Sequence, residues 1–157
     1  MIDQTSGRFN AVISEEALAD EIVGRVLPDG GYRIEPYLAW LVADAVESPG
    51  LGVGLAHPMF TYFAAQGGIG VTLDELFAMA YATSDDGVML GTAELDIVRP
   101  LEVGQRFDVV GTVEDVTRKS GRTGVFDIVT YRLEMRDAAV LCATLTLGFI
   151  YPRESRR

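Results

Sequence analysis

The sequence predicts an α+β domain in which an antiparallel sheet wraps around one apolar helix. Three observations carry this prediction. Apolar residues recur at helical spacing in the first half of the chain, apolar and polar residues alternate along four long segments in the second half, and short turns separate those segments. Helices followed by consecutive strands are typical of α+β domains. We expect the sheet to cover the helix, because no other part of the chain can bury its apolar side chains.

A helix and a turn are expected over residues 11–34, after a polar and loose stretch at 1–10. Ser14 precedes acidic residues and then apolar residues at helical spacing, which predicts a helix over 14–27. The proline and the paired glycines of "LPDGGYRI" then indicate a turn.

A second short helix is predicted over residues 35–48. Pro36 suits its first turn, where the missing proline N–H costs no hydrogen bond. Four larger apolar side chains are expected to form its packing side: Tyr37, Trp40, Leu41 and Val46.

The central apolar helix is predicted in two pieces, 58–66 and 72–83, separated by a glycine-rich break. Thr72 and Glu75 form a capping-box pattern at the start of the second piece. Long strands follow and are expected to be joined by hairpin-like turns, so that neighbouring strands run antiparallel. Their segments are 91–101, 105–119, 124–137 and 139–153.

Composition limits the class of protein. The 157 residues are expected to form one domain, 1–157, and the net charge of −10 disfavours nucleic acid and anionic membrane surfaces as partners. No apolar stretch reaches the ~20 residues of a membrane-spanning helix. The single cysteine, Cys142, excludes an internal disulfide and a thiolate zinc cluster and is expected to be buried. We expect a cytoplasmic protein.

Two elements resemble a known family. "AHPMF" leads into the central helix, and "RPLEVGQRF" over 99–107 ends an apolar strand at a proline and starts the next strand after a turn. Over about residues 35–152 the chain is similar to hot-dog proteins, and among them to the MaoC-like dehydratases, or (R)-specific enoyl-CoA hydratases. The fold that this resemblance implies is an antiparallel sheet wrapped around a central helix.

The resemblance also implies chemistry. Its members bind acyl thioesters of CoA or of acyl carrier protein and add water to a trans-2-enoyl thioester, or remove it from the 3-hydroxy form. An aspartate and a histidine hold the water, a backbone N–H at the start of the helix polarises the thioester carbonyl, and two hot-dog units pair side by side. No cofactor and no metal site are implied. The expected partner is a second hot-dog chain, in a homodimer or a heterodimer.

The usual Asp-x-Asn-Pro-x-His motif is missing from this sequence, whose only histidine is His57. Two interpretations remain open. In the first, His57 takes the catalytic role, with Asp44 or Glu47 as the carboxylate. In the second, the chain resembles the catalytically silent half of a double hot-dog, and its partner supplies both residues. His57 could equally serve as a hydrogen-bonding group at the helix entrance.

Pro58 follows His57 and has no N–H, so an oxyanion donor would have to be Met59 or Phe60, whose first-turn amides lack helical partners. Gly67 and Gly68 are expected either to widen an acyl pocket or to kink the helix. The basic cluster "TRKSGRTG" supplies candidate ligands for CoA phosphates or for phosphopantetheine, with a solvated hairpin tip as the alternative. These candidates are Arg118, Lys119 and Arg122.

Three functions follow from these residues. The first is a hydratase or dehydratase. The second is a hot-dog thioesterase that uses Asp74 or Glu75 near the helix. The third is a non-catalytic thioester-binding subunit that shapes the acyl pocket of an active hot-dog chain.

Overall fold

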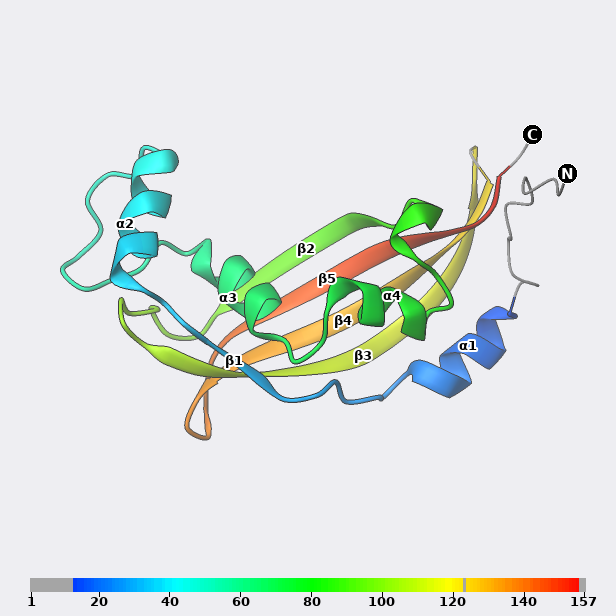
Figure 1. Ribbon diagram of the computed structural model, residues 1–157, viewed down its shortest axis with the longest axis horizontal. Coiled ribbons are helices and arrows are strands. Elements are labelled where there is room, and N and C mark those ends of the chain that lie inside the picture. Colours follow the sequence, from blue (N-terminus) through cyan, green and yellow to red (C-terminus); the bar gives the residue numbers. More distant parts are fainter. Residues whose placement is uncertain (1–12, 123, 156–157) are drawn as a thin grey trace, which may run out of the picture.

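The computed structural model describes residues 13–122 and 124–155, so the stretch expected to be loose, 1–10, lies outside the described residues. Figure 1 shows a curved five-stranded sheet with α3 and α4 lying across one face. The helices are α1 (Glu15–Ile22), α2 (Pro36–Ala45), α3 (Phe60–Gly68) and α4 (Leu73–Met79), with a single turn of 3₁₀ helix at Ser84–Asp86. The strands are β1 (Gly30–Arg33), β2 (Met89–Ile97), β3 (Arg106–Gly121), β4 (Gly124–Asp137) and β5 (Val140–Ser155).

The sheet has the order β1-β3-β4-β5-β2, and every neighbouring pair runs antiparallel. The four long strands and the hairpins β3–β4 and β4–β5 are confirmed. The expected hairpin between β2 and β3 is wrong, because β2 pairs with β5 at the far edge. The segment 98–105 carries the chain past β5 and β4. Local patterns locate strands, but only tertiary packing decides which strands pair.

The predicted turn at 27–34 contains strand β1, which pairs with Arg106–Val109 of β3. The paired glycines of this segment do not form a turn. They allow the backbone of β1 to lie close to neighbouring backbone. A Cβ on Gly30 would lie 2.0 Å from the carbonyl oxygen of Gly68, so only glycine lets β1 pass directly beneath the end of α3.

Helix α1 begins as predicted, with the Ser14 side chain accepting the Ala17 N–H at 3.1 Å. It ends at Ile22, earlier than expected. The next residues add to the sheet instead: the Leu27 N–H donates to the Gly111 carbonyl at 2.8 Å. Backbone pairing with β3 therefore replaces the last turns of the predicted helix.

Helix α2 begins at Pro36 as predicted, but its expected packing side is wrong. Tyr37 and Trp40 are 63% and 66% exposed, and only Ala39 of this helix is buried. Figure 1 shows the reason: α2 stands beyond the end of the sheet, where no other element of the described chain covers it. Helical spacing predicts a helix but not the element against which it packs.

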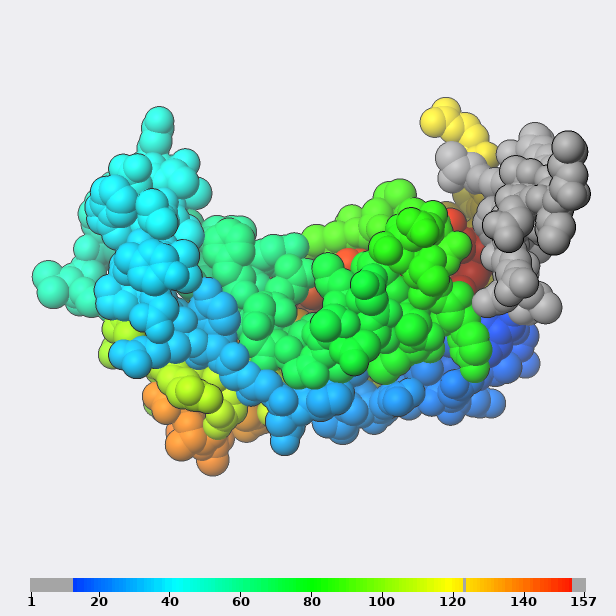
Figure 2. Space-filling model, viewed as in Figure 1, coloured from blue at the N-terminus to red at the C-terminus, as the bar shows by residue number. Residues whose placement is uncertain are grey.

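The core lies between the sheet and α3. Phe60, Ala64 and Ala65 of α3 are buried against the concave face, and alternate residues of β4 complete that core. The wrapped central helix is thus confirmed. The opposite side of α3 is open, with Phe63 40% exposed, and Figure 2 shows α3 and α4 at the molecular surface. The capping box of α4 is also confirmed, since Thr72 and Glu75 hydrogen-bond reciprocally. In the described chain, no helix is long and apolar enough to cross a membrane.

Candidate functional site

His57 lies in the segment that enters α3. This segment is fixed to the turn before β3, because the Ala56 N–H donates to the Leu101 carbonyl at 2.8 Å and Leu55 forms a bridge with Glu102. The His57 side chain is partly exposed. The backbone therefore places the imidazole at the start of the central helix, as the sequence predicts.

The imidazole acts as a hydrogen-bond acceptor for the helix entrance. The Met59 N–H donates to Nδ1 of His57 at 3.2 Å. In a neutral imidazole one nitrogen accepts and the other carries the proton, so this hydrogen bond assigns the proton to Nε2. With Nδ1 accepting this hydrogen bond, Nε2 faces other groups as a donor. The geometry favours the helix-entrance alternative over a general base.

The amides considered as oxyanion donors are already in use. The Met59 N–H is bound by the imidazole, and the Phe60 N–H donates to the His57 carbonyl at 2.9 Å. An oxyanion hole needs donors aimed at an empty position where charge develops. Neither amide is aimed at such a position in this structure.

Asp44 and Glu47 are both exposed, and among the described residues no hydrogen bond or ion pair joins either carboxylate to His57. Glu47 has a specific structural role. Its φ is +49°, its N–H donates to the Asp44 carbonyl, and the Ser48 N–H donates to the Ala43 carbonyl. These bonds form a Schellman motif, which ends α2 with a left-handed residue that is usually glycine.

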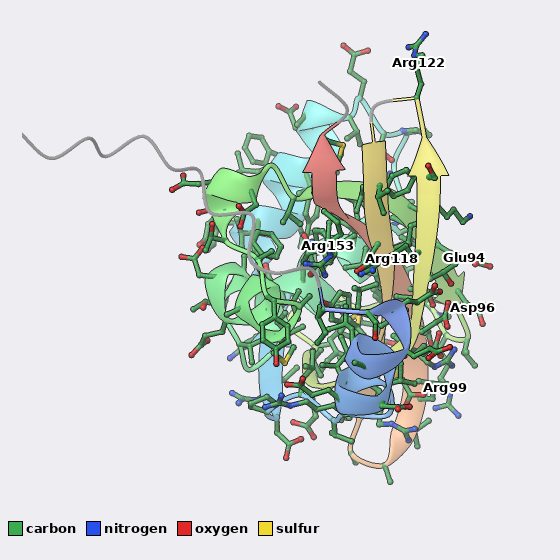
Figure 3. The ribbon with its side chains drawn as sticks, turned by 90° about the vertical axis from the view of Figure 1, so that its right-hand side faces the viewer. Glu94, Asp96, Arg99, Arg118, Arg122 and Arg153 are labelled. Carbon is green, nitrogen blue, oxygen red and sulfur yellow. The ribbon has the colours of Figure 1, made fainter. Side chains whose placement is uncertain are left out.

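The three basic candidates fall into two groups. Lys119 and Arg122 are exposed near the β3–β4 turn, and Figure 3 shows Arg122 pointing away from the molecule. Arg118 is committed elsewhere: its guanidinium donates to both oxygens of Asp127, at 2.7 and 3.0 Å. The hairpin tip thus keeps two basic side chains available to a ligand, and the third belongs to an internal ion pair.

That ion pair is part of a buried cluster that sequence reasoning missed. Arg153 donates to Asp127 at 2.7 Å and to the Ala80 carbonyl at 2.8 Å, and Arg118 donates to the Ile13 carbonyl at 2.8 Å. We call Arg118, Asp127 and Arg153 the arginine clasp. Figure 3 shows its two arginines next to one another. The clasp ties β3, β4 and β5 to the end of α4 and to the segment before α1.

The clasp determines the charge of its central carboxylate. Asp127 is fully buried, which by itself would raise its pKa, but hydrogen bonds from Arg118 and Arg153 and then their charges outweigh burial. The pKa of Asp127 is therefore lowered, and the carboxylate stays ionised. The alternation of side chains along β4 indicates that Asp127 is buried, because Asp127 falls on the same face as the buried Val129 and Tyr131.

Gly67 and Gly68 do not widen a pocket. A Cβ on Gly68 would lie 2.6 Å from Cγ2 of Val109, and one on Gly67 would lie 3.1 Å from the Tyr32 ring. The space beside both glycines is filled by neighbouring side chains. They allow α3 to approach β1 and β3 closely.

A small cavity lies between α3, α4 and the sheet. Its walls are apolar except for the amide of Gln66 and the phenol of Tyr131. Tyr131 shares a 2.7 Å hydrogen bond with Tyr151, and burial, partly offset by this hydrogen bond, raises its pKa to about 12. The cavity measures about 10 Å³, which is room for about one water molecule. An acyl chain does not fit there in this arrangement.

No protein-family model matches the sequence, and no curated protein matches it either. Solved structures match the fold. The HadBC (3R-hydroxyacyl-ACP dehydratase) complex of Mycobacterium tuberculosis has a TM-score of 0.62 at 16% identity, over 82% of this chain and 96% of that chain. The ChsH1–ChsH2 complex of the same organism has a TM-score of 0.66 at 14% identity, over 91% and 93%. A MaoC-like dehydratase from Phytophthora capsici has a TM-score of 0.65 at 12% identity, over 88% of this chain and 50% of that chain.

These similarities establish the fold. The chain has the hot-dog fold, and it shares this fold with MaoC-like dehydratases. At such identities the fold alone is shown, so the activity has to be argued from the residues of the site.

Proposed function

We propose that this chain is a MaoC-like acyl-thioester-binding subunit that pairs with a second hot-dog chain, which carries the catalytic aspartate and histidine of a hydratase or dehydratase. One observation carries the proposal: the only histidine uses Nδ1 to hold the entrance of α3 and has no carboxylate partner among the described residues. Hydration requires a base for water and a donor for the enolate oxygen. This site supplies neither.

Two further features support a shared acyl pocket. The cavity between α3, α4 and the sheet is too small for an acyl chain, whereas apolar side chains near the start of α3 are exposed. Met59 and Phe63 are 37% and 40% exposed, and they offer an apolar wall to a chain that packs against this side. Of the three basic candidates, Lys119 and Arg122 remain available to bind the phosphates of CoA or of the phosphopantetheine arm of a carrier protein. Two of the solved structures that share the fold are complexes of two named components.

A hot-dog thioesterase is less well supported. Glu75 accepts hydrogen bonds from the N–H and hydroxyl of Thr72 in the capping box, at 2.8 and 2.9 Å. These bonds lower its pKa, which weakens it as a base. Asp74 is exposed in the same helical turn.

The test compares the chain alone with a complex. The chain is coexpressed with a MaoC-like chain that carries the full Asp-x-Asn-Pro-x-His motif, and hydration of crotonyl-CoA and longer enoyl-CoAs is followed by absorbance. We expect no turnover by the chain alone, turnover by the complex, and an unchanged kcat when His57→Ala is introduced into the complex. Turnover by the chain alone that His57→Ala abolishes would show that it is itself the hydratase. Release of free thiol from acyl-CoA would instead indicate a thioesterase.

A further inference from the structure

Helix α2 presents an uncovered side at one end of the molecule. Figures 1 and 2 show α2 and the loop that follows it projecting beyond the end of the sheet. The spacing i, i+3, i+4 and i+7 places four exposed residues on one side of this helix, opposite the buried Ala39. We call these four residues the aromatic face of α2: Tyr37, Trp40, Leu41 and Asp44.

The functional groups of the aromatic face are available to a ligand. Among the residues that the structure describes, no hydrogen bond, ion pair or ring contact engages Tyr37, Trp40 or Asp44. Residues three or four apart on a helix have Cβ atoms about 5–6 Å apart, so two rings and one carboxylate can meet the same ligand. No lysine or arginine occurs between Arg33 and Arg99 in the sequence, so no cation of this segment neutralises the carboxylate.

Two aromatic rings beside a carboxylate are the groups that recognise a quaternary ammonium ion. The faces of tryptophan and tyrosine rings attract a cation, and aromatic residues are the usual ligands of choline-like groups. The ion has no N–H to donate, so it needs opposite charge and ring faces instead of hydrogen-bond acceptors. An anionic ligand would meet Asp44 and a net charge of −10. The aromatic face therefore fits a cation that is surrounded by methyl groups.

The surroundings of this face favour an ammonium group at a lipid surface over a dissolved one. Leu41 on the helix and Leu51 and Val53 on the following loop also expose apolar side chains. Because this end of the molecule projects outward, it does not enclose a dissolved ion. A phosphatidylcholine layer presents trimethylammonium groups outermost and apolar chains beneath them. Tryptophan and tyrosine rings lie at the level of such headgroups, and aliphatic side chains reach below them.

We propose that α2 and the loop 48–55 dock this protein on lipid surfaces that carry choline headgroups. Tyr37 and Trp40 bind the trimethylammonium group, Asp44 pairs with its charge, and Leu51 and Val53 enter the layer below. The net charge that disfavours anionic membranes does not oppose this zwitterionic surface. The inference concerns a surface apart from the α3 entrance and does not rest on the proposed function.

The test uses Trp40, the only tryptophan of the chain, whose fluorescence reports on this face alone. Phosphatidylcholine vesicles are titrated into the protein, and cosedimentation with sucrose-loaded vesicles gives the bound fraction. We expect saturable binding with a blue shift of the emission. Binding should weaken when phosphatidylglycerol replaces part of the lipid, because the surface becomes anionic. Dissolved phosphocholine should bind far more weakly than the vesicles, because it offers no apolar layer.

The variant Asp44→Asn distinguishes headgroup recognition from simple apolar adsorption. Removing this charge makes the face more apolar, so adsorption driven by apolar area alone would become tighter. Headgroup recognition instead predicts roughly 2- to 5-fold weaker binding, and Tyr37→Leu, which keeps an apolar side chain but removes the ring, should weaken binding by a similar factor. The matched control is Asp20→Asn at an exposed site of α1, which changes the net charge equally and should not weaken binding.

Four results would overturn the inference. The first is no binding to phosphatidylcholine vesicles, and the second is an Asp44→Asn variant that binds them at least as tightly as the wild type. The third is equal affinity for dissolved phosphocholine, which would assign the face to a soluble ammonium ligand. The fourth is a dimer in sedimentation velocity whose formation shifts the Trp40 emission without vesicles, which would show that a second copy covers α2. None of these results involves a thioester, so the proposed function keeps its own assay.

Discussion

Replacing Asp127 with asparagine should destabilise the protein strongly, because it removes the central charge of the arginine clasp. The buried carboxylate accepts three hydrogen bonds from Arg118 and Arg153, two at 2.7 Å and one at 3.0 Å. Asp127→Asn keeps the shape but removes the negative charge that both guanidinium groups contact, and one of these groups belongs to Arg153, which is only 7% exposed. Breaking a buried ion pair in this way costs about 3–5 kcal/mol. That is a large share of the ~5–15 kcal/mol that stabilises a typical domain.

The assay is urea and thermal unfolding followed by circular dichroism. For a chain of this size the expected loss corresponds to roughly 6–20 °C in Tm. The matched control is Glu134→Gln on the same strand, which breaks ion pairs of a 23% exposed carboxylate with Arg132 and Arg136. Partly exposed pairs contribute about 0–1 kcal/mol. If Asp127→Asn cost no more than the control, the clasp would not stabilise the fold and this reasoning would be refuted.

The same substitution should change the response to acid. The pKa of Asp127 in the folded state lies below its unfolded value, which is about 3.9 for a free aspartate. The unfolded chain therefore binds this proton first as the pH falls. The stability that the ionised carboxylate contributes is complete above about pH 4 and is lost as the pH drops toward the folded pKa. The difference in unfolding free energy between wild type and Asp127→Asn should shrink over that range. A constant difference would argue against an ionised Asp127.

Three further substitutions test the local structure. His57→Ala leaves the Met59 N–H without its acceptor and should cost about 0.5–1.5 kcal/mol in urea unfolding. An unchanged stability would show that this hydrogen bond is dispensable. Glu47→Gly replaces a non-glycine residue in the left-handed conformation and should stabilise the fold by about 1 kcal/mol. The urea midpoint of this variant should lie above those of the wild type and of the control Glu47→Ala. A loss of stability would contradict the Schellman role. Gly68→Ala places a methyl group 2.6 Å from Val109 and should lower the free energy of unfolding by about 1–3 kcal/mol. An unchanged Tm in thermal unfolding would mean that α3 can shift at little cost.

Interactions between residues close together in the sequence allow much of this fold to be predicted. Ser14, Pro36 and the Thr72–Glu75 capping box mark helix starts, because caps satisfy amides within one turn of the chain. The alternation along 124–137 marks β4, because neighbouring side chains of a strand point to opposite faces. The resemblance of "AHPMF" and "RPLEVGQRF" to hot-dog proteins led to the correct fold. These properties depend on residues that are close together in the sequence.

The sequence predicts only part of the candidate site. The sequence identified His57 at the entrance of α3, but only the hydrogen bond from the Met59 N–H to Nδ1 distinguishes a general base from a group that holds the helix entrance. Arg118 looked like a phosphate ligand, because its partners Asp127 and Arg153 are 9 and 35 positions further along the chain. Glu47 looked like a catalytic carboxylate until its positive φ identified it as the end of a helix.

By itself the sequence determined the helices, the four long strands, the wrapped central helix and the acidic character of the chain. The tertiary structure alone decided that β2 pairs with β5, that α2 exposes its apolar side, and that Asp127 lies buried between two arginines. The physical reason is the range of the interactions. Caps and side-chain periodicity act within a few residues, whereas strand order, helix docking and buried ion pairs depend on contacts between segments far apart in the chain.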